Sequence, residues 1–109
     1  LKQPLTYYLP DITYDKDIPS PEEFLGYQIG EWHISHDQQL AYMRKLAGLS
    51  PRIVLNEIGR TYEGRPTINL IITSEKNHER LDEIQEQHLA LNDPSRSAEV
   101  DIKDLPAVL

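Results

Sequence analysis

The chain has 109 residues, a formal net charge of −7 and no cysteine. This length suits one domain, and 39% hydrophobic with 27% charged residues predicts a folded chain with a modest core. An acidic surface repels phosphate backbones and anionic lipids, so we expect no nucleic-acid or membrane partner. The lack of cysteine excludes disulfides, thiolate catalysis and cysteine-ligated zinc.

The first 34 residues are expected to form an N-terminal arm rich in proline and tyrosine. Residues 1–30 contain four of the eight prolines and four of the six tyrosines. Proline fixes φ and removes a backbone donor, so regular structure should be interrupted here. We interpret the segment as a meandering arm whose aromatic side chains pack on a neighbouring surface. Aromatic lining of a ligand groove is the less favoured alternative.

A helix is predicted from residue 35 onwards, and both of its ends carry signals. Ser35 and Gln38 have the spacing of a capping box. Gly48 is expected to stop the helix in a left-handed conformation, and Pro51 to prevent its continuation. Four apolar residues recur at helical spacing and predict one buried face: Leu40, Met43, Leu46 and Ala47.

Residues 52–74 change to the alternation that is typical of strands. β-Branched residues dominate two runs, which predicts two strands joined by a turn around Glu63 and Gly64. Arg60 and Arg65 flank Glu63 and are expected to pair with it or with the strand ends.

The turn lies within "IGRTYEGRP", residues 58–66, which has the glycine spacing of a phosphate-binding loop. Such a loop continues with lysine, then serine or threonine, at the start of a helix, whereas this chain continues with Arg65, Pro66 and a strand. The pattern therefore excludes a phosphate site. We expect Gly64 to supply the positive φ of a tight turn and Gly59 to permit a bulge.

A second helix is predicted to begin at Asn77 as its cap and to end at Asn92-Asp93-Pro94. Its apolar side would carry Leu81, Ile84, His88 and Leu91. Residues 95–104 are a polar connection, and "LPAVL", residues 105–109, is predicted to be a short apolar strand.

These residues do not predict a self-contained active site. His33 and His36 straddle a helix start and need not converge, so no metal ligands are assigned. His88 is expected to be partly buried with one hydrogen bond. No pair of carboxylates is forced together, and the serines lie at caps or in loops, so no catalytic residue is assigned.

Residues 51–74 nevertheless resemble the early strand pair of the zinc metallocarboxypeptidases, the carboxypeptidase A-like peptidases. The family pattern is an apolar strand, Ile-Gly-x-Ser-x-Glu-Gly-Arg and a second apolar strand, and Thr61 stands where serine is usual. The matching residues are Ile58, Gly59, Glu63, Gly64 and Arg65. Together with the helix ahead of them, the likeness covers most of residues 19–109 and is greatest to a bacterial branch.

The resemblance implies an α/β fold class, namely the N-terminal part of a mixed-sheet α/β/α fold with helix, β-hairpin, helix and strand in that order. Residues 1–34 would be the arm and residues 35–109 an incomplete peptidase domain. The parent would be a periplasmic or extracellular hydrolase, a protease that uses zinc to cleave peptide or protein substrates near their C-termini. Its His-x-x-Glu ligands and general base would lie beyond Leu109, so this portion should be inactive and hold no zinc.

The alternative is a small non-catalytic α/β protein-interaction module. By the resemblance, residues 106–109 have lost their natural strand neighbours, and one edge of the hairpin is open. We therefore expect self-association through open strand edges, or folding of "PAVL" back against its own hairpin.

Overall fold

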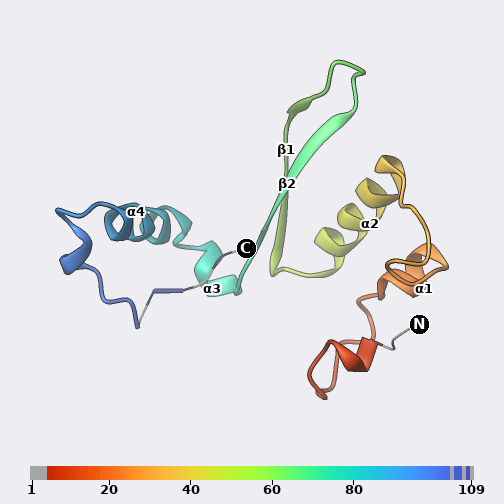
Figure 1. The fold of residues 1–109 in the computed structure, drawn as a ribbon, viewed down its shortest axis with the longest axis horizontal. Helices are drawn as coiled ribbons and strands as arrows, with labels where there is room; N and C mark the ends of the chain where they lie inside the picture. Colours follow the sequence, from red (N-terminus) through yellow and green to blue (C-terminus); the bar gives the residue numbers. More distant parts are fainter. Residues whose placement is uncertain (1–4, 104, 107, 109) are drawn as a thin grey trace.

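The computed structural model describes residues 5–103, 105, 106 and 108, and these form a mixed α/β structure with one two-stranded antiparallel sheet. In chain order the elements are η1 (Leu5–Tyr7), α1 (Pro21–Leu25), α2 (His36–Leu49), β1 (Ile53–Arg60), β2 (Pro66–Ile72), α3 (Glu75–His78), α4 (Leu81–Asn92) and η2 (Ser97–Glu99). The β1–β2 hairpin stands between two helical units, with α1 and α2 on one side and α3 and α4 on the other (Figure 1).

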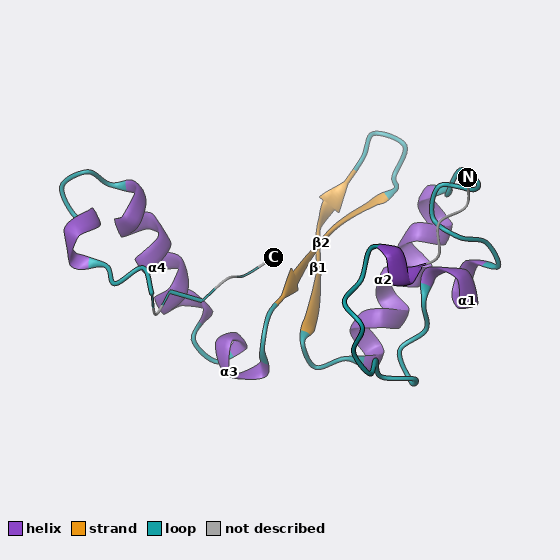
Figure 2. Ribbon diagram, turned by 60° about the horizontal axis from the view of Figure 1, so that its bottom comes forward, coloured by secondary structure: helices purple, strands orange, loops and turns teal. Residues whose placement is uncertain are grey.

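The three units are spread out rather than wrapped around one core (Figure 2). The radius of gyration is 17.6 Å, against about 13 Å for a compact chain of this length. The accessible surface is 8844 Å², against roughly 6,200 Å² for a compact monomer of this mass. Each unit therefore depends mainly on local contacts.

Helix α2 confirms the predicted capping box. The Ser35 hydroxyl accepts a hydrogen bond from the Gln38 N–H, and the Gln38 side chain accepts one from the Ser35 N–H. The prediction that Gly48 ends the helix in a left-handed conformation is wrong. Gly48 lies inside α2, which continues to Leu49, and the N–H of Ser50 still bonds to a carbonyl of the last turn. Helical bonding thus continues until the chain nears Pro51.

The N-terminal arm contains a short helix, α1, that packs on α2. Ser20 and Glu23 form a capping box, and Gly26 ends α1 with a φ of 82°. The rings of Phe24 and Tyr42 lie 5.2 Å apart, and the Tyr42 hydroxyl donates to a carbonyl of the arm.

The expected packing of the arm's tyrosines is wrong for three of the four. Tyr7 and Tyr8 are each 68% exposed and Tyr14 is 49% exposed, whereas Tyr27 is half-buried. The first two rings contact each other edge to face instead of a surface of the protein.

The predicted hairpin is confirmed. Ile53 pairs with Ile72 at the open end and Arg60 with Pro66 at the turn end, and the register shifts between Glu57 and Gly59. The shift is the bulge expected at this glycine. Ile53, Leu55, Ile68 and Leu70 are half-buried, and Ile68 and Leu70 line a cleft with side chains of α2.

The second helical region is divided in two, and the prediction that Asn77 caps it is wrong. Ser74 caps the short helix α3, and Asn77 lies inside α3, where its amide donates to Thr73 Oγ1. Helix α4 follows from Leu81 to Asn92 and buries Ile84 and Ala90. The predicted end at Asn92-Asp93-Pro94 is confirmed.

The polar connection after α4 contains the turn η2, which packs on α4. The predicted strand "LPAVL" is not formed by residues 105, 106 and 108. Ala107 and Leu109 lie outside the described residues.

Candidate functional site

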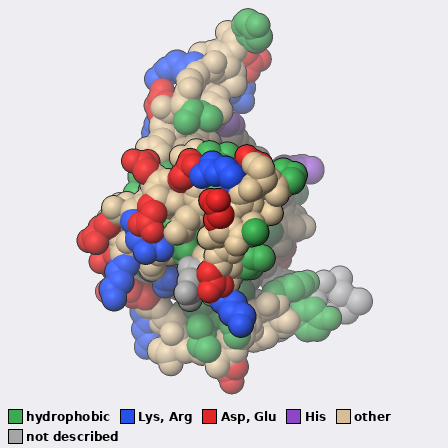
Figure 3. All heavy atoms as spheres, turned by 90° about the vertical axis from the view of Figure 1, so that its left-hand side faces the viewer, with side chains coloured by type: hydrophobic (Ala, Val, Ile, Leu, Met, Phe, Trp, Pro, Cys, Tyr) green, Lys and Arg blue, Asp and Glu red, His purple; other side chains and the backbone are tan. Residues whose placement is uncertain are grey.

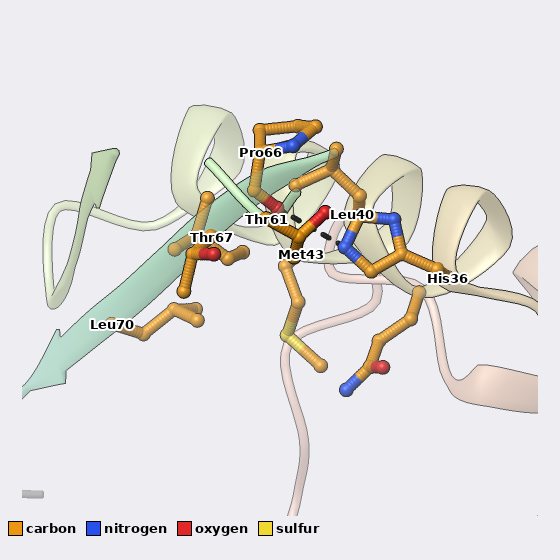
Figure 4. Close-up of a pocket in the computed structure, with 9 residues that line it drawn as sticks. His36, Leu40, Met43, Thr61, Pro66, Thr67 and Leu70 are labelled. Carbon is orange, nitrogen blue, oxygen red and sulfur yellow. Dashed lines mark hydrogen bonds between the residues drawn. The ribbon is translucent and has the colours of Figure 1, made fainter. Parts of the chain in front are cut away.

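One concave site is a cleft of ≈ 370 Å³ between α2 and the hairpin. Figure 4 shows side chains from α2 and from the start of β2 converging on it. The lining residues are His36, Gln39, Leu40, Met43, Thr61, Pro66, Thr67, Ile68 and Leu70. Most are apolar, so the cleft is a continuation of the packed interface between α2 and the sheet.

His36 is the titratable group of this cleft, and its hydrogen bonding limits what it can do. Nε2 donates to the Pro66 carbonyl at 3.1 Å, which ties the first turn of α2 to the start of β2 (Figure 4). Nδ1 is buried with no hydrogen-bond partner in the described part of the chain, and it lies 3.8 Å from an Asp37 carboxylate oxygen, beyond hydrogen-bond range. Because Nε2 donates a hydrogen bond and Nδ1 is buried, the imidazole serves to hold α2 against the start of β2.

The five residues of the family-like motif lie around the hairpin turn, next to Thr61 and Pro66 of the cleft. Gly64 has a φ of 75°, as expected from the sequence. The Arg65 Nε lies 3.0 Å from Glu63 Oε2, which confirms one expected ion pair. Ile58 is 63% exposed at the bulge beside Gly59.

Arg60 takes the second of its expected pairings, with groups near the strand ends instead of with Glu63. Its Nη2 lies 3.1 Å from Glu57 Oε1, and its Nη1 donates to the Gly64 carbonyl at 3.0 Å. Thr61 completes the turn, because its N–H donates to the Arg65 carbonyl and its hydroxyl accepts from the Arg65 N–H. The polar groups of this motif therefore bond to one another and to neighbouring residues of the hairpin.

Two further histidines form hydrogen bonds between segments that are distant in sequence. His78 Nε2 donates to the Arg52 carbonyl at 3.1 Å, and His88 Nε2 donates to the Pro106 carbonyl at 3.2 Å. The second contact confirms that His88 is half-buried with one hydrogen bond. The hydrogen bonds made by His36 and His78 were not predicted, since no sequence signal marks an acceptor carbonyl so far away along the chain.

Charged groups outside the interface between α2 and the sheet stabilise turns and helix ends. Hydrogen bonds from the Ser20 backbone and hydroxyl lower the pKa of Glu23. The pKa of Asp93 is lowered by hydrogen bonds from the Ser95 hydroxyl and N–H. A hydrogen bond and charge attraction to Glu86 raise the pKa of Arg96.

The face formed by the C-terminal helices carries acidic and basic side chains interspersed, and the hairpin projects beyond it (Figure 3). A second groove of ≈ 440 Å³ lies between β2 and α4. Its lining residues are Leu70, Ile71, Leu81, Ile84, Gln85, His88 and Val108. It is an apolar packing surface that is incompletely covered.

Within the described residues no group of three His, Asp or Glu side chains is placed to hold a metal ion. His33 is exposed and makes no hydrogen bond with the described part of the chain, while His36 is engaged at the cleft. Among the described residues there is also no helix long and apolar enough to span a bilayer.

Comparisons with protein-family models, with characterised proteins and with solved structures found no match to this chain.

Proposed function

We propose that this chain is the N-terminal portion of a zinc-dependent metallocarboxypeptidase, a secreted peptidase of the periplasm or extracellular space. The proposal rests on one observation above the others. The residues that resemble the family, Ile58 to Arg65, form a closed hairpin turn that follows a capped helix packed on the same sheet. This is the order of elements that the family carries ahead of its first zinc ligands.

In this proposal the described residues form a scaffold and do not perform the chemistry. The histidines at 36, 78 and 88 already donate to backbone carbonyls, so the described residues do not fit a zinc site. Zinc, which activates water and polarises a scissile carbonyl in such peptidases, would be held by residues of the parent that this chain does not include. The N-terminal portion would position the sheet on which those ligands lie.

The test begins with the gene that encodes this chain. A His-x-x-Glu motif within about ten codons after Leu109 is expected, since two zinc ligands follow the next strand in such peptidases. The longer protein should release C-terminal residues from peptides, lose this activity on chelation and regain it with zinc. Replacing the histidine of that motif with alanine should abolish activity without changing the circular dichroism spectrum.

The 109-residue chain provides the matching negative experiment. After dialysis it should retain no stoichiometric zinc and should cleave no peptide. Stoichiometric zinc that disappears in both His33→Ala and His36→Ala would contradict the proposal, because it would place a metal site in the scaffold itself.

A second candidate is a non-catalytic protein-interaction module with a mixed α/β architecture. The observation that favours it is the accessible surface of 8844 Å², which is far larger than a self-contained domain of this size requires. Absence of the His-x-x-Glu motif, together with retained folding of the 109-residue chain, would favour the module over the peptidase.

A further inference from the structure

The hairpin has two edges that pair with no further strand of the described residues, although the Pro66 carbonyl on the β2 edge already accepts a hydrogen bond from His36. The pattern of hydrogen bonds decides which backbone groups the edges present. The Thr73 N–H donates to the Arg52 carbonyl at 3.1 Å, so these two residues form a hydrogen-bonded pair just outside the paired strands. Hydrogen-bonded and non-hydrogen-bonded pairs alternate along an antiparallel ladder. Ile53, Leu55 and Glu57 therefore direct their backbone groups away from β2.

Most of these β1 groups have no partner among the described residues. The Ile53 N–H is occupied, because it donates to the Ser50 carbonyl at 3.2 Å. The Ile53 carbonyl and both backbone groups of Leu55 and Glu57 remain available. The bulge after Glu57 ends this flat stretch, which limits the pairing surface to residues 53–57.

The edge of β2 is less suited to pairing. The Thr61 N–H donates to the Arg65 carbonyl at 2.9 Å, so the same alternation places Pro66 among the residues that face outward. Proline has no N–H to offer a further strand. β1 contains neither proline nor lysine, the residues that commonly protect edge strands.

Surface area and charge both favour a second copy of the chain as the occupant of this edge. The excess accessible surface is roughly 2,600 Å² above that of a compact monomer, and a stable interface needs only about 800 Å² from each partner. Residues 52–73 contain three arginines and two glutamates, so this region is +1 while the rest of the chain is −8. The hairpin is thus the region where two acidic chains meet with least repulsion.

We propose that two copies of this chain join through the free edge of β1, which pairs antiparallel with itself about a two-fold axis at Leu55. Leu55 of each copy exchanges both backbone hydrogen bonds with Leu55 of the other. The Glu57 N–H of each copy donates to the Ile53 carbonyl of the other. The result is a four-stranded sheet in which the same surface serves both subunits, as a two-fold interface requires.

Analytical ultracentrifugation of the 109-residue chain at micromolar concentration tests the association. We expect a dimer, and Glu57→Pro should weaken it about tenfold or more because proline removes an outward N–H that edge strands otherwise donate. Glu57→Gln is the matched control, because it also removes the ion pair with Arg60 but keeps the N–H, and it should dimerise as the parent chain does. A monomer at all concentrations up to about 100 μM would overturn the proposal.

Single cysteines test the geometry independently of any folding defect in the proline variant, since the chain has no thiol of its own. Leu55→Cys should form a disulfide between copies on mild oxidation, because opposed residues lie about 5.5 Å apart across such a pair. Tyr62→Cys at the exposed turn is the control and should not, as it would lie roughly 20 Å along the strand from the axis. Equal cross-linking of both variants, or of Tyr62→Cys alone, would refute pairing at β1.

This inference does not depend on the peptidase proposal. The dimer assigns a partner to the edge of β1 and is measured on this chain alone, whereas the peptidase proposal is tested by the residues and activity of the longer protein. A dimer without the His-x-x-Glu motif, or the motif without a dimer, would separate the two.

Discussion

The two helical units on either side of the hairpin are stabilised in different ways. Helix α2 begins with a complete capping box at Ser35 and is preceded by a second box at Ser20. Helix α4 begins at Leu81 after the N-cap residue Arg80, which makes no side-chain cap. It relies on Ile84, which is 2% exposed. The position of α2 is therefore determined largely by its own sequence, whereas α4 depends on contacts with other segments.

The largest expected effect is therefore at the core of the α4 unit. Ile84→Ala should destabilise this unit by about 3 kcal/mol, the usual cost of removing a buried aliphatic side chain and leaving a cavity. Hydrogen exchange should show amides of α4 losing protection while those of α2 keep theirs. Leu89→Ala, at an exposed position on the same helix, is the control and should change little. Equal loss of protection in both helices would show that the units fold as one.

The hairpin provides the next prediction, because its turn is encoded by a backbone conformation. Gly64→Ala should cost about 1.5 kcal/mol, since a φ of 75° is unfavourable for a residue with a Cβ atom. No atom lies within 4 Å of the added Cβ, so the cost comes from the backbone alone.

Gly48→Ala is the matched control for that substitution. Gly48 lies inside α2 with open space around it, so alanine should stabilise the chain by about 1 kcal/mol. The two changes in thermal midpoint should have opposite signs. A common sign would show that the turn or the helix interior has been misassigned.

The hairpin and α2 were predictable from sequence because their signals are local. Alternation, the Glu63-Gly64 turn and the Ser35 box each act within a few residues, and all three are confirmed. The start of α4 was not predictable in the same way. Asn77 has the residue type of a cap, yet Ser74 begins a separate turn first and Asn77 bonds back to Thr73.

The acceptors of the long-range histidine hydrogen bonds could not be predicted from the sequence. The pattern at His88 predicted a partly buried histidine with one hydrogen bond, but it could not name Pro106 as the acceptor. The bonds from His36 to Pro66 and from His78 to Arg52 join segments whose relation is set by tertiary packing. The cleft beside His36 was likewise invisible in the sequence, because it exists only where α2 crosses the hairpin.

The contrast between the helix starts gives a third prediction. Ser35→Ala should destabilise α2 by about 1 kcal/mol through loss of its cap. Arg80→Ala at the start of α4 should cost no more than a few tenths of a kcal/mol, because within the described residues its side chain makes only an exposed ion pair to Glu83 at 3.8 Å. Urea midpoints of the two variants would measure the difference. A larger loss at Arg80 would show that α4 is also specified at its start.

The smallest effect, and the one most dependent on pH, is expected at Tyr42, which joins α2 to the arm. Tyr42→Phe should cost about 0.5 to 1 kcal/mol at neutral pH, because the buried hydroxyl donates to the Pro19 carbonyl at 2.9 Å. Burial, and to a lesser degree the negative charge of Glu23, raises the pKa of this phenol above its ordinary value. The folded state therefore favours the protonated phenol more than the unfolded state does.

This pKa shift sets the direction of the pH dependence. The stabilisation from Tyr42 is fully present below the unfolded pKa of about 10 and is lost as the pH rises through the higher folded pKa. The difference between the parent chain and Tyr42→Phe should thus be constant from pH 7 to 9 and shrink above about pH 10. Tyr14→Phe is the control, because its hydroxyl also donates to a carbonyl, at 2.8 Å, but the side chain is 49% exposed. If both variants follow the same pH curve, Tyr42 is not buried between α2 and the arm, and the contrast between the two helical units loses its N-terminal anchor.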